Sequence, residues 1–244
     1  MSTSTRADVE VDFRLPSDFQ EILAGASAAE ARAAVTARYG PEAAAGLPPA
    51  LLDAAVAEYL TASELLEQEG VFYAAGCLGL LDGELSLSSL TLARIEADCA
   101  DPETAVEGVL RIRRRGQGSD QRRADRYDLP AGPAAVVIES SVGLLLPAAD
   151  LGTDADLPLQ VATLQAYLPV PRAADPSGRT MIVLTFSTPS VRHWDDYCPV
   201  VVDLLRSLRF PAADPRPATR AAVPPPSAPP EGAPTRSTIR DALG

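Results

Sequence analysis

The fold is decided by residues 180–210, which read TMIVLTFSTPSVRHWDDYCPVVVDLLRSLRF. Residues 181–186 hold β-branched and aromatic apolar side chains in a short run, which predicts a strand buried on one or both faces. After Pro189 the apolar residues recur at spacings of three and four, which predicts a helix lying on the sheet. Its expected apolar face comprises Val191, Trp194, Cys198, Val201, Leu205 and Leu208.

Two prolines set the expected limits of this helix. Thr188 can cap its start, with Pro189 at the first helical position, where a missing N–H costs nothing. Pro199 removes a backbone donor further along and disfavours the helical conformation at Cys198. We therefore predict a kink or a short break at Pro199, with the main helix running from there onward.

A hairpin signal precedes this stretch. The pair Asp82-Gly83 separates two apolar runs, Val71–Leu81 and Glu84–Glu96. An Asp-Gly pair favours a two-residue hairpin turn, because both turn residues need positive φ. Within the second run the leucines change parity across Ser88-Ser89, which predicts a bulge in that strand.

The other elements follow in an order typical of an α+β sandwich. Helices are predicted over residues 51–69 and from Asp101, as the cap, to a stop at Gly116. Residues 9–13 suit an edge strand or an extended arm, and residues 116–125 are a predicted charged loop. Residues 127–141 are predicted to hold two strands around a tight turn at LPAGPA, and residues 159–168 a further strand. Strands that follow one another without helices pair antiparallel, so we expect a mainly antiparallel sheet flanked by helices.

Composition divides the chain into three parts. Residues 1–50 form an N-terminal arm and weak Ala-rich helices, residues 51–210 the α+β sandwich, and residues 211–244 a Pro-rich tail. The tail is poor in bulky apolar residues and is predicted to be a disordered linker. Within it, Ile239 and Leu243 are four residues apart, and this pair is either a docking peptide for a protein partner or incidental.

The charge distribution bears on partners. A net charge of −12 argues against general nucleic-acid binding. Arginines nevertheless cluster in the middle of the chain, at Arg111, Arg113, Arg114, Arg115, Arg122, Arg123 and Arg126. This cluster is either a solvated helix end and loop or a patch for an acidic partner, a phosphate-bearing ligand or the chain's own acidic N-terminal part.

Targeting signals and cysteines point to one compartment. No apolar run reaches the roughly 18 residues that span a bilayer, so no membrane insertion is expected. The first residues lack the basic-then-apolar pattern of a signal peptide, so a cytoplasmic location is expected. Cys77, Cys99 and Cys198 are odd in number and far apart, which predicts reduced and mostly buried thiols rather than a disulfide framework or a zinc site.

No motif for catalysis is present. His193 is the only histidine, so a Ser–His–Asp or Cys–His site would have to use it, but its place at a helix start predicts a surface residue. There is no GxSxG nucleophile elbow and no phosphate-binding loop. Asp150, Asp154 and Asp156 lack the glycine and the distal glutamate of a calcium loop. No catalytic residue, metal or cofactor is therefore predicted.

Three segments resemble those of a loose group of uncharacterised actinobacterial proteins. They are LPAGPA at residues 129–134, YLPVP at residues 167–171 and LTFSTP at residues 184–189, followed by the apolar closing helix. The resemblance covers about the second half of the folded part. It implies a PsbP-like α/β/α sandwich, a fold of generally non-enzymatic accessory proteins, some of which accompany specialised secretion loci. Pro199 and the Pro-rich tail depart from the pattern of that group.

These observations favour one function over two others. The leading hypothesis is a non-enzymatic, cytoplasmic adaptor or chaperone-like accessory protein that binds a protein partner, because a folded sandwich is joined to a tethered apolar pair. The first alternative is a small-ligand-binding or enzymatic domain with a cleft between sheet and helix near His193. The second is nucleic-acid binding through the arginine cluster. A homo-oligomer is compatible with each of them.

Overall fold

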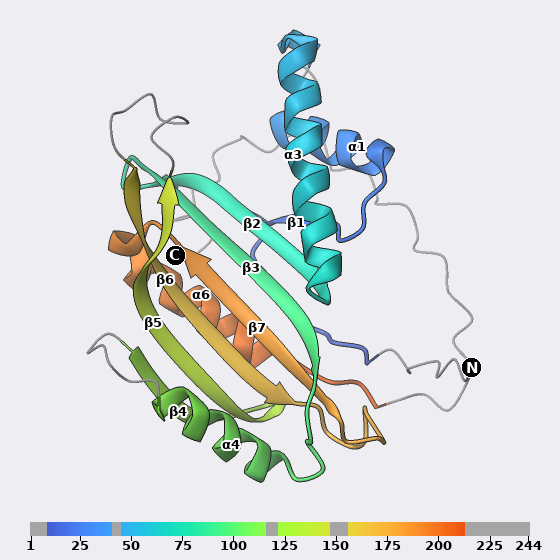
Figure 1. Cartoon of the computed structure of the whole chain (residues 1–244), viewed down its shortest axis with the longest axis vertical. Coiled ribbons are helices and arrows are strands. Elements are labelled where there is room, and N and C mark those ends of the chain that lie inside the picture. Colours follow the sequence, from blue (N-terminus) through green and yellow to red (C-terminus); the bar gives the residue numbers. More distant parts are fainter. Residues whose placement is uncertain (1–8, 41–44, 116–121, 147–155, 213–244) are drawn as a thin grey trace, which may run out of the picture.

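The computed structural model of the chain describes residues 9–40, 45–115, 122–146 and 156–212. In this part, seven strands form one antiparallel sheet in the order β1-β2-β3-β7-β6-β5-β4 (Figure 1). The strands are β1 (Gln20–Ile22), β2 (Val71–Leu81), β3 (Glu84–Glu96), β4 (Arg122–Leu129), β5 (Gly132–Leu146), β6 (Leu157–Pro169) and β7 (Thr180–Thr188). The predicted α+β fold with a mainly antiparallel sheet is confirmed, and β7 is its central strand.

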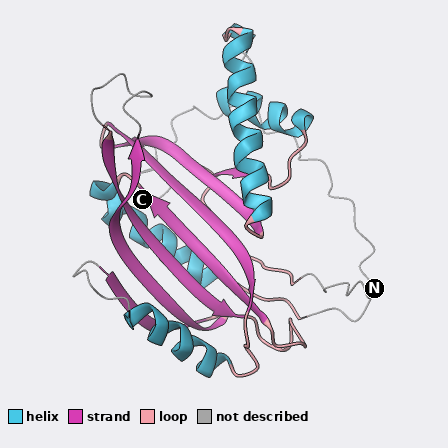
Figure 2. Ribbon diagram, in the orientation of Figure 1, coloured by secondary structure: helices cyan, strands magenta, loops and turns pink. Residues whose placement is uncertain are grey.

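Helices lie on both faces of this sheet. They are α1 (Ala28–Tyr39), α3 (Pro49–Gln68), α4 (Pro102–Arg115) and α6 (Trp194–Ser207), with a short 3-10 turn, η1 (Val191–His193), before α6. Helix α6 covers one face, which we call the α6 face, and α4 lies against the other, the α4 face, on the β4 side (Figure 2). The hairpin of α1 and α3 stands at the β1–β2 end of the sheet (Figure 1).

The core follows from the alternation of side chains along the strands. On the α6 face, Leu184 and Phe186 of β7 pack with Tyr197 and Leu204 of α6 in the main buried cluster. On the α4 face, a smaller cluster forms under α4, which contributes Val106 and Leu110. Both faces of the central strands are therefore partly buried, as their apolar composition predicts.

Strand β3 keeps strict alternation, so the predicted bulge at Ser88-Ser89 is wrong. Its pairing with β2 runs without a shift from Leu85 opposite Leu80 to Thr91 opposite Ala74. Leu90 and Leu92 are fully buried on the α6 face, whereas Leu85 and Leu87 are 67% and 44% exposed on the α4 face. The parity of the leucines changes because the first pair in the sequence lies on the α4 face and the second pair on the α6 face, not because the strand is bulged.

Helix α6 is continuous from Trp194 to Ser207 with Pro199 inside it, so the predicted start of the main helix at Pro199 is wrong. Pro199 lies in the second turn of α6. Its missing N–H leaves only one carbonyl, that of Asp195 four residues earlier, without its usual helical hydrogen bond. Thr188 does not cap this helix. It ends β7, where its hydroxyl donates to the carbonyl of Leu87 at 2.6 Å and accepts from the N–H of Ser190 at 3.0 Å.

The N-terminal residues pack on the same core as the rest of the sheet. Residues 9–16, which we call the arm, run along the α6 face, where Val9 is buried and Asp12 forms an antiparallel bridge with Arg209. Strand β1 was not predicted, because it lies in the N-terminal segment that was predicted to form weak helices. It pairs with residues 74–76 of β2. Three residues are too short for a periodic signal, so only the sheet edge reveals this strand.

Strand β4 begins at Arg122, earlier than the predicted loop over residues 116–125 allows. Its sequence is highly charged because β4 is the edge strand, and charged side chains at an edge protect it from pairing with other chains. The hairpin turn between β4 and β5 falls within the LPAGPA segment, as predicted, with Gly132 at φ +125°.

The three cysteines are free, as predicted. Burial, reinforced by nearby carboxylates, raises the pKa of Cys77 and of Cys99 to about 11. Burial also raises the pKa of Cys198, which is only half-buried. None of the helices in the described ranges is long and apolar enough to cross a bilayer.

Several predictions fall outside the described residues. They concern the disorder of the tail, the apolar pair Ile239 and Leu243, the loop carboxylates Asp150 and Asp154, and the helix stop at Gly116. These stay predictions.

Candidate functional site

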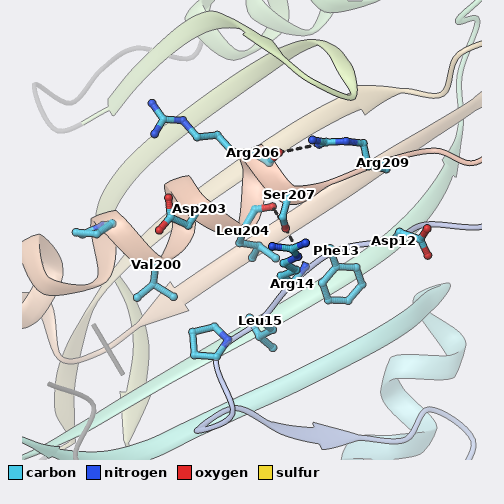
Figure 3. A pocket seen from close by; sticks show the side chains of 12 residues that line it. Asp12, Phe13, Arg14, Leu15, Val200, Asp203, Leu204, Arg206, Ser207 and Arg209 are labelled. Carbon is cyan, nitrogen blue, oxygen red and sulfur yellow. Dashed lines mark hydrogen bonds between the residues drawn. The ribbon is translucent and has the colours of Figure 1, made fainter. Parts of the chain in front are cut away.

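Helix α6 lies between two grooves. The first, the arm groove, has a volume of about 980 Å³ and separates the helix from the arm (Figure 3). The second, the apolar groove, has a volume of about 560 Å³ and separates the opposite side of the helix from β4, β5 and the turn between them. Arg206 lines both grooves.

The arm groove is about equally polar and apolar and carries charges of both signs. Its exposed charged residues are Asp12, Arg14, Asp203, Arg206 and Arg209. The guanidinium of Arg209 donates to the carbonyls of Arg206 and Leu208 at 2.7 Å, and the N–H of Arg14 donates to the Ser207 hydroxyl at 2.8 Å. The contact of Arg14 with Ser207 fastens the arm to the end of α6, and Figure 3 shows Arg206 pointing away from the arm.

The apolar groove is built from the predicted apolar stripe of α6. Trp194, Cys198, Val201 and Leu205 recur at spacings of three and four and all line it, joined by Val202. The sheet contributes Val136, Ile138 and Leu164, and the β4–β5 hairpin contributes Tyr127, Leu129 and Pro130. Helix α6 thus has an apolar surface wider than the part that the sheet covers.

Charged groups mark the two ends of the apolar groove. Asp128 and Arg206 lie at one end, and both are exposed. At the other end, a hollow of about 320 Å³ shares Ile138 and Trp194 with the groove. This hollow adds Glu139, Arg192 and Asp195 to its lining. The site therefore suits an apolar group flanked by polar or charged ones.

His193 is buried, so the prediction of a surface histidine is wrong. It is 5% exposed, and its Nδ1 lies 2.9 Å from the hydroxyl of Ser86 on β3. The same hydroxyl lies 2.7 Å from that of Tyr197, and the carboxylate of Glu84 lies 3.9 Å from Nε2. A residue at a helix start is exposed only when no other element covers it. Here the β2–β3 hairpin covers His193.

The residues Ser86, His193 and Glu84 have the composition of a hydrolytic triad, but their geometry favours a structural role. Ser86 is fully buried, and its hydroxyl is engaged by both His193 and Tyr197. A nucleophile must reach its substrate, and this hydroxyl lies beneath the start of α6. The network therefore joins β3 to η1 and α6, and Tyr197 also lines the apolar groove.

The structure splits the arginine cluster. Arg113 stacks on the ring of Tyr167 with its guanidinium carbon 5.1 Å from the ring centre, and Arg114 donates to the carbonyl of Ala124 at 2.9 and 3.1 Å. The strand arginines Arg122, Arg123 and Arg126 form ion pairs with Glu139, Asp125 and Glu103 respectively. In the described part of the chain, Arg111 and Arg115 have no such partner, so any patch for an acidic partner centres on these two.

One exposed surface was missed in the sequence. Leu78, Leu80, Leu85 and Leu87 lie on the α4 face of the β2–β3 hairpin, where Leu78 is opposite Leu87 and Leu80 is opposite Leu85. Leu78 and Leu80 are 57% and 55% exposed. The signal was the parity change in β3, which places leucines on both faces of one strand.

No group of His, Cys, Asp or Glu suited to hold a metal ion occurs among the described residues. The chain matches no protein-family model, and no curated protein is similar to it.

Proposed function

We propose that the protein is a non-enzymatic accessory protein that binds an apolar segment of a protein partner in the apolar groove along α6. The observation that carries the proposal is the groove itself: an almost wholly apolar channel of about 560 Å³, with charged residues at both ends. A cytoplasmic adaptor or chaperone-like role, and a PsbP-like classification of the sandwich, belong to the same proposal.

The arm provides an example of a segment bound beside α6. Its alternate residues Val9, Val11, Phe13 and Leu15 pack on the core, and Asp12 exchanges two main-chain hydrogen bonds with Arg209, at 2.8 and 3.0 Å. On the other side of the helix, the apolar groove offers a comparable apolar floor. A partner segment with apolar side chains on one side would cover this floor as the arm covers its own.

The groove is large enough for about two or three apolar side chains. Burying each of them gains about 1.5–3 kcal/mol. Ordering the segment and losing translational freedom offset much of that gain. We therefore expect a transient complex with a dissociation constant in the micromolar to millimolar range, roughly as weak as signalling and chaperone contacts.

Val202 offers the sharpest test, because it lines the groove and is 41% exposed. Val202→Asp should leave folding intact and place a charge in the apolar channel. The matched control is Leu65→Asp, an exposed apolar residue of α3, which stands at the β1–β2 end of the sheet (Figure 1) and does not line the groove. A partner identified by affinity purification and mass spectrometry is then titrated, as a purified protein, against the three forms. Val202→Asp should weaken binding at least tenfold and Leu65→Asp should not, and equal affinities would contradict the proposal.

The second candidate is a small-ligand-binding domain that uses the same cleft. Its volume lies within the range of about 300–1,000 Å³ that is typical of small-molecule sites. The lining is apolar, and Trp194 and Tyr127 offer aromatic surfaces, so an apolar ligand is indicated. Native mass spectrometry of the purified protein distinguishes the candidates: a retained small molecule that Val202→Asp releases favours the ligand-binding function.

A further inference from the structure

We propose that residues 237–243 of the same chain, STIRDAL, occupy the apolar groove when no partner is bound. The inference rests on the proposed function, since it concerns regulation of that same groove. The segment acts as an internal competitor: it covers the apolar surface of α6, and a partner must displace it.

The composition of residues 213–244 selects this segment. Val223, Ile239 and Leu243 are its only bulky apolar residues. Val223 precedes three consecutive prolines, which restrict the backbone around it. Ile239 and Leu243 are four apart, so one helical turn presents both on the same side, as a groove with room for two or three side chains requires.

The connection is long enough. The described chain continues from α6 to Ala212, and 26 residues separate Ala212 from Ile239. A Pro-rich chain extends by about 3.1 Å per residue, so this connection reaches up to about 80 Å. The groove runs beside a helix of 14 residues, about 21 Å long. Every part of the groove is therefore within reach, at an effective concentration of about millimolar.

Charges at the groove's end match those of the segment. Arg206 is exposed and forms no ion pair with another described residue, and Asp128, which is exposed and paired with Arg126, lines the same groove. Arg240 and Asp241 lie between the two apolar residues of the segment. Asp241 can face Arg206 while Arg240 faces Asp128, which fixes the direction of the segment in the groove. Attraction of this kind orients a weak complex more than it strengthens it.

The groove contains two built-in probes of occupancy. Trp194 is the only tryptophan of the chain and lines the groove. Cys198 lines it as well and is half-buried, whereas Cys77 and Cys99 are fully buried elsewhere. Tryptophan emission and the rate of Cys198 modification by a thiol reagent therefore report on one place.

The test uses the full chain with Ile239→Asp and Leu243→Asp combined. The matched control combines Val223→Asp and Ala228→Asp, which makes the same charge change in the same segment. The double variant at Ile239 and Leu243 should shift Trp194 emission to longer wavelength and raise the Cys198 modification rate at least threefold. The control should behave as the unchanged protein. Identical emission and modification rates in all three forms would overturn the proposal.

A dilution series separates the intramolecular arrangement from exchange between copies. Protection of Cys198 should be the same over a hundredfold range of protein concentration. Protection that grows with concentration would show that a second copy supplies the segment, and would overturn the proposal as stated. Partner titration in the variant at Ile239 and Leu243 distinguishes this proposal from the proposed function. If Val202→Asp still weakens binding at least tenfold there, the groove remains the partner site even where the segment fails to occupy it.

Discussion

The hydroxyl of Tyr197 on α6 lies 2.7 Å from the hydroxyl of Ser86 on β3, although 111 residues separate them. Both side chains are fully buried, and Ser86 also contacts His193. This polar contact joins the β2–β3 hairpin to the helix that borders both grooves. It thus fixes the position of α6 on the sheet.

Ser86→Ala tests this contact. The substitution leaves the hydroxyl of Tyr197 and a ring nitrogen of His193 buried without their partner, and each such group costs about 1–3 kcal/mol. We expect the free energy of unfolding to fall by about 2–5 kcal/mol in urea denaturation. Ser89→Ala, on the exposed side of the same strand, should change it by less than about 0.5 kcal/mol. Equal effects of the two variants would show that the buried hydroxyl contributes nothing.

Asp175 should make stability depend on pH in acid. Burial alone raises the pKa of this carboxyl, but hydrogen bonds from the Ser177 hydroxyl and N–H and from the N–H groups of Arg179 and Thr180 outweigh it and lower the pKa to about 2. An unfolded Asp has a pKa near 3.9. The stabilisation, on the order of 2 kcal/mol, is thus fully present above about pH 4 and is lost as the pH falls through about 2.

Asp175→Asn should remove this dependence. Denaturation midpoints measured from pH 5 to pH 2 should decline less steeply in the variant than in the unchanged protein. Asp203→Asn, at an exposed position on α6, serves as the control and should keep the original slope. Parallel curves for Asp175→Asn and the unchanged protein would contradict the role of this carboxylate.

The strict alternation of β3 predicts opposite outcomes for neighbouring leucines. Leu90→Ala and Leu92→Ala should each lower the free energy of unfolding by about 2–5 kcal/mol, because both side chains are fully buried. Leu85→Ser and Leu87→Ser should each change it by less than about 0.5 kcal/mol. Denaturant titration of the four variants checks the expected difference. A large loss at Leu87 would mean that the hairpin has the other register.

The thiols should differ in reactivity. At pH 8 the raised pKa values and burial of Cys77 and Cys99 keep both thiols protonated and covered, so only Cys198 should react with a thiol reagent in the native protein. All three should react in denaturant. Counting the modified thiols by mass spectrometry under both conditions checks this, and Cys198→Ser should abolish the native reaction.

The arginines of the cluster should differ in their effect on stability, although the sequence presents them as one group. Arg113→Ala should lower the free energy of unfolding by about 1 kcal/mol, because the guanidinium stacks on Tyr167. Arg111→Ala combined with Arg115→Ala should leave stability unchanged, because both residues are exposed and neither side chain forms an ion pair or hydrogen bond with another described residue. Thermal denaturation measures both effects. The double variant is thus the suitable one for any binding assay with acidic partners or nucleic acid.

Local patterns sufficed to predict much of the fold. The hairpin at Asp82-Gly83, the start of α4 at Asp101 and the central strand β7 all have signals within a few residues, because turn conformations, caps and alternation act over that range. The apolar stripe of α6 was also predicted, including Trp194 and Cys198, which line the candidate site. The site residues on the sheet were not, because nothing local shows which strand face α6 will leave uncovered.

Sequence alone thus determined most of the strands and helices, though not β1 or the start of β4, and which side of α6 is apolar. Only the tertiary structure decided that Pro199 is tolerated within α6, that His193 is covered by the hairpin and that the arm fills one side of α6 while the other stays open. The last two depend on contacts between residues about a hundred or more positions apart. Whether a residue is buried depends on such contacts, so a local sequence pattern cannot predict it.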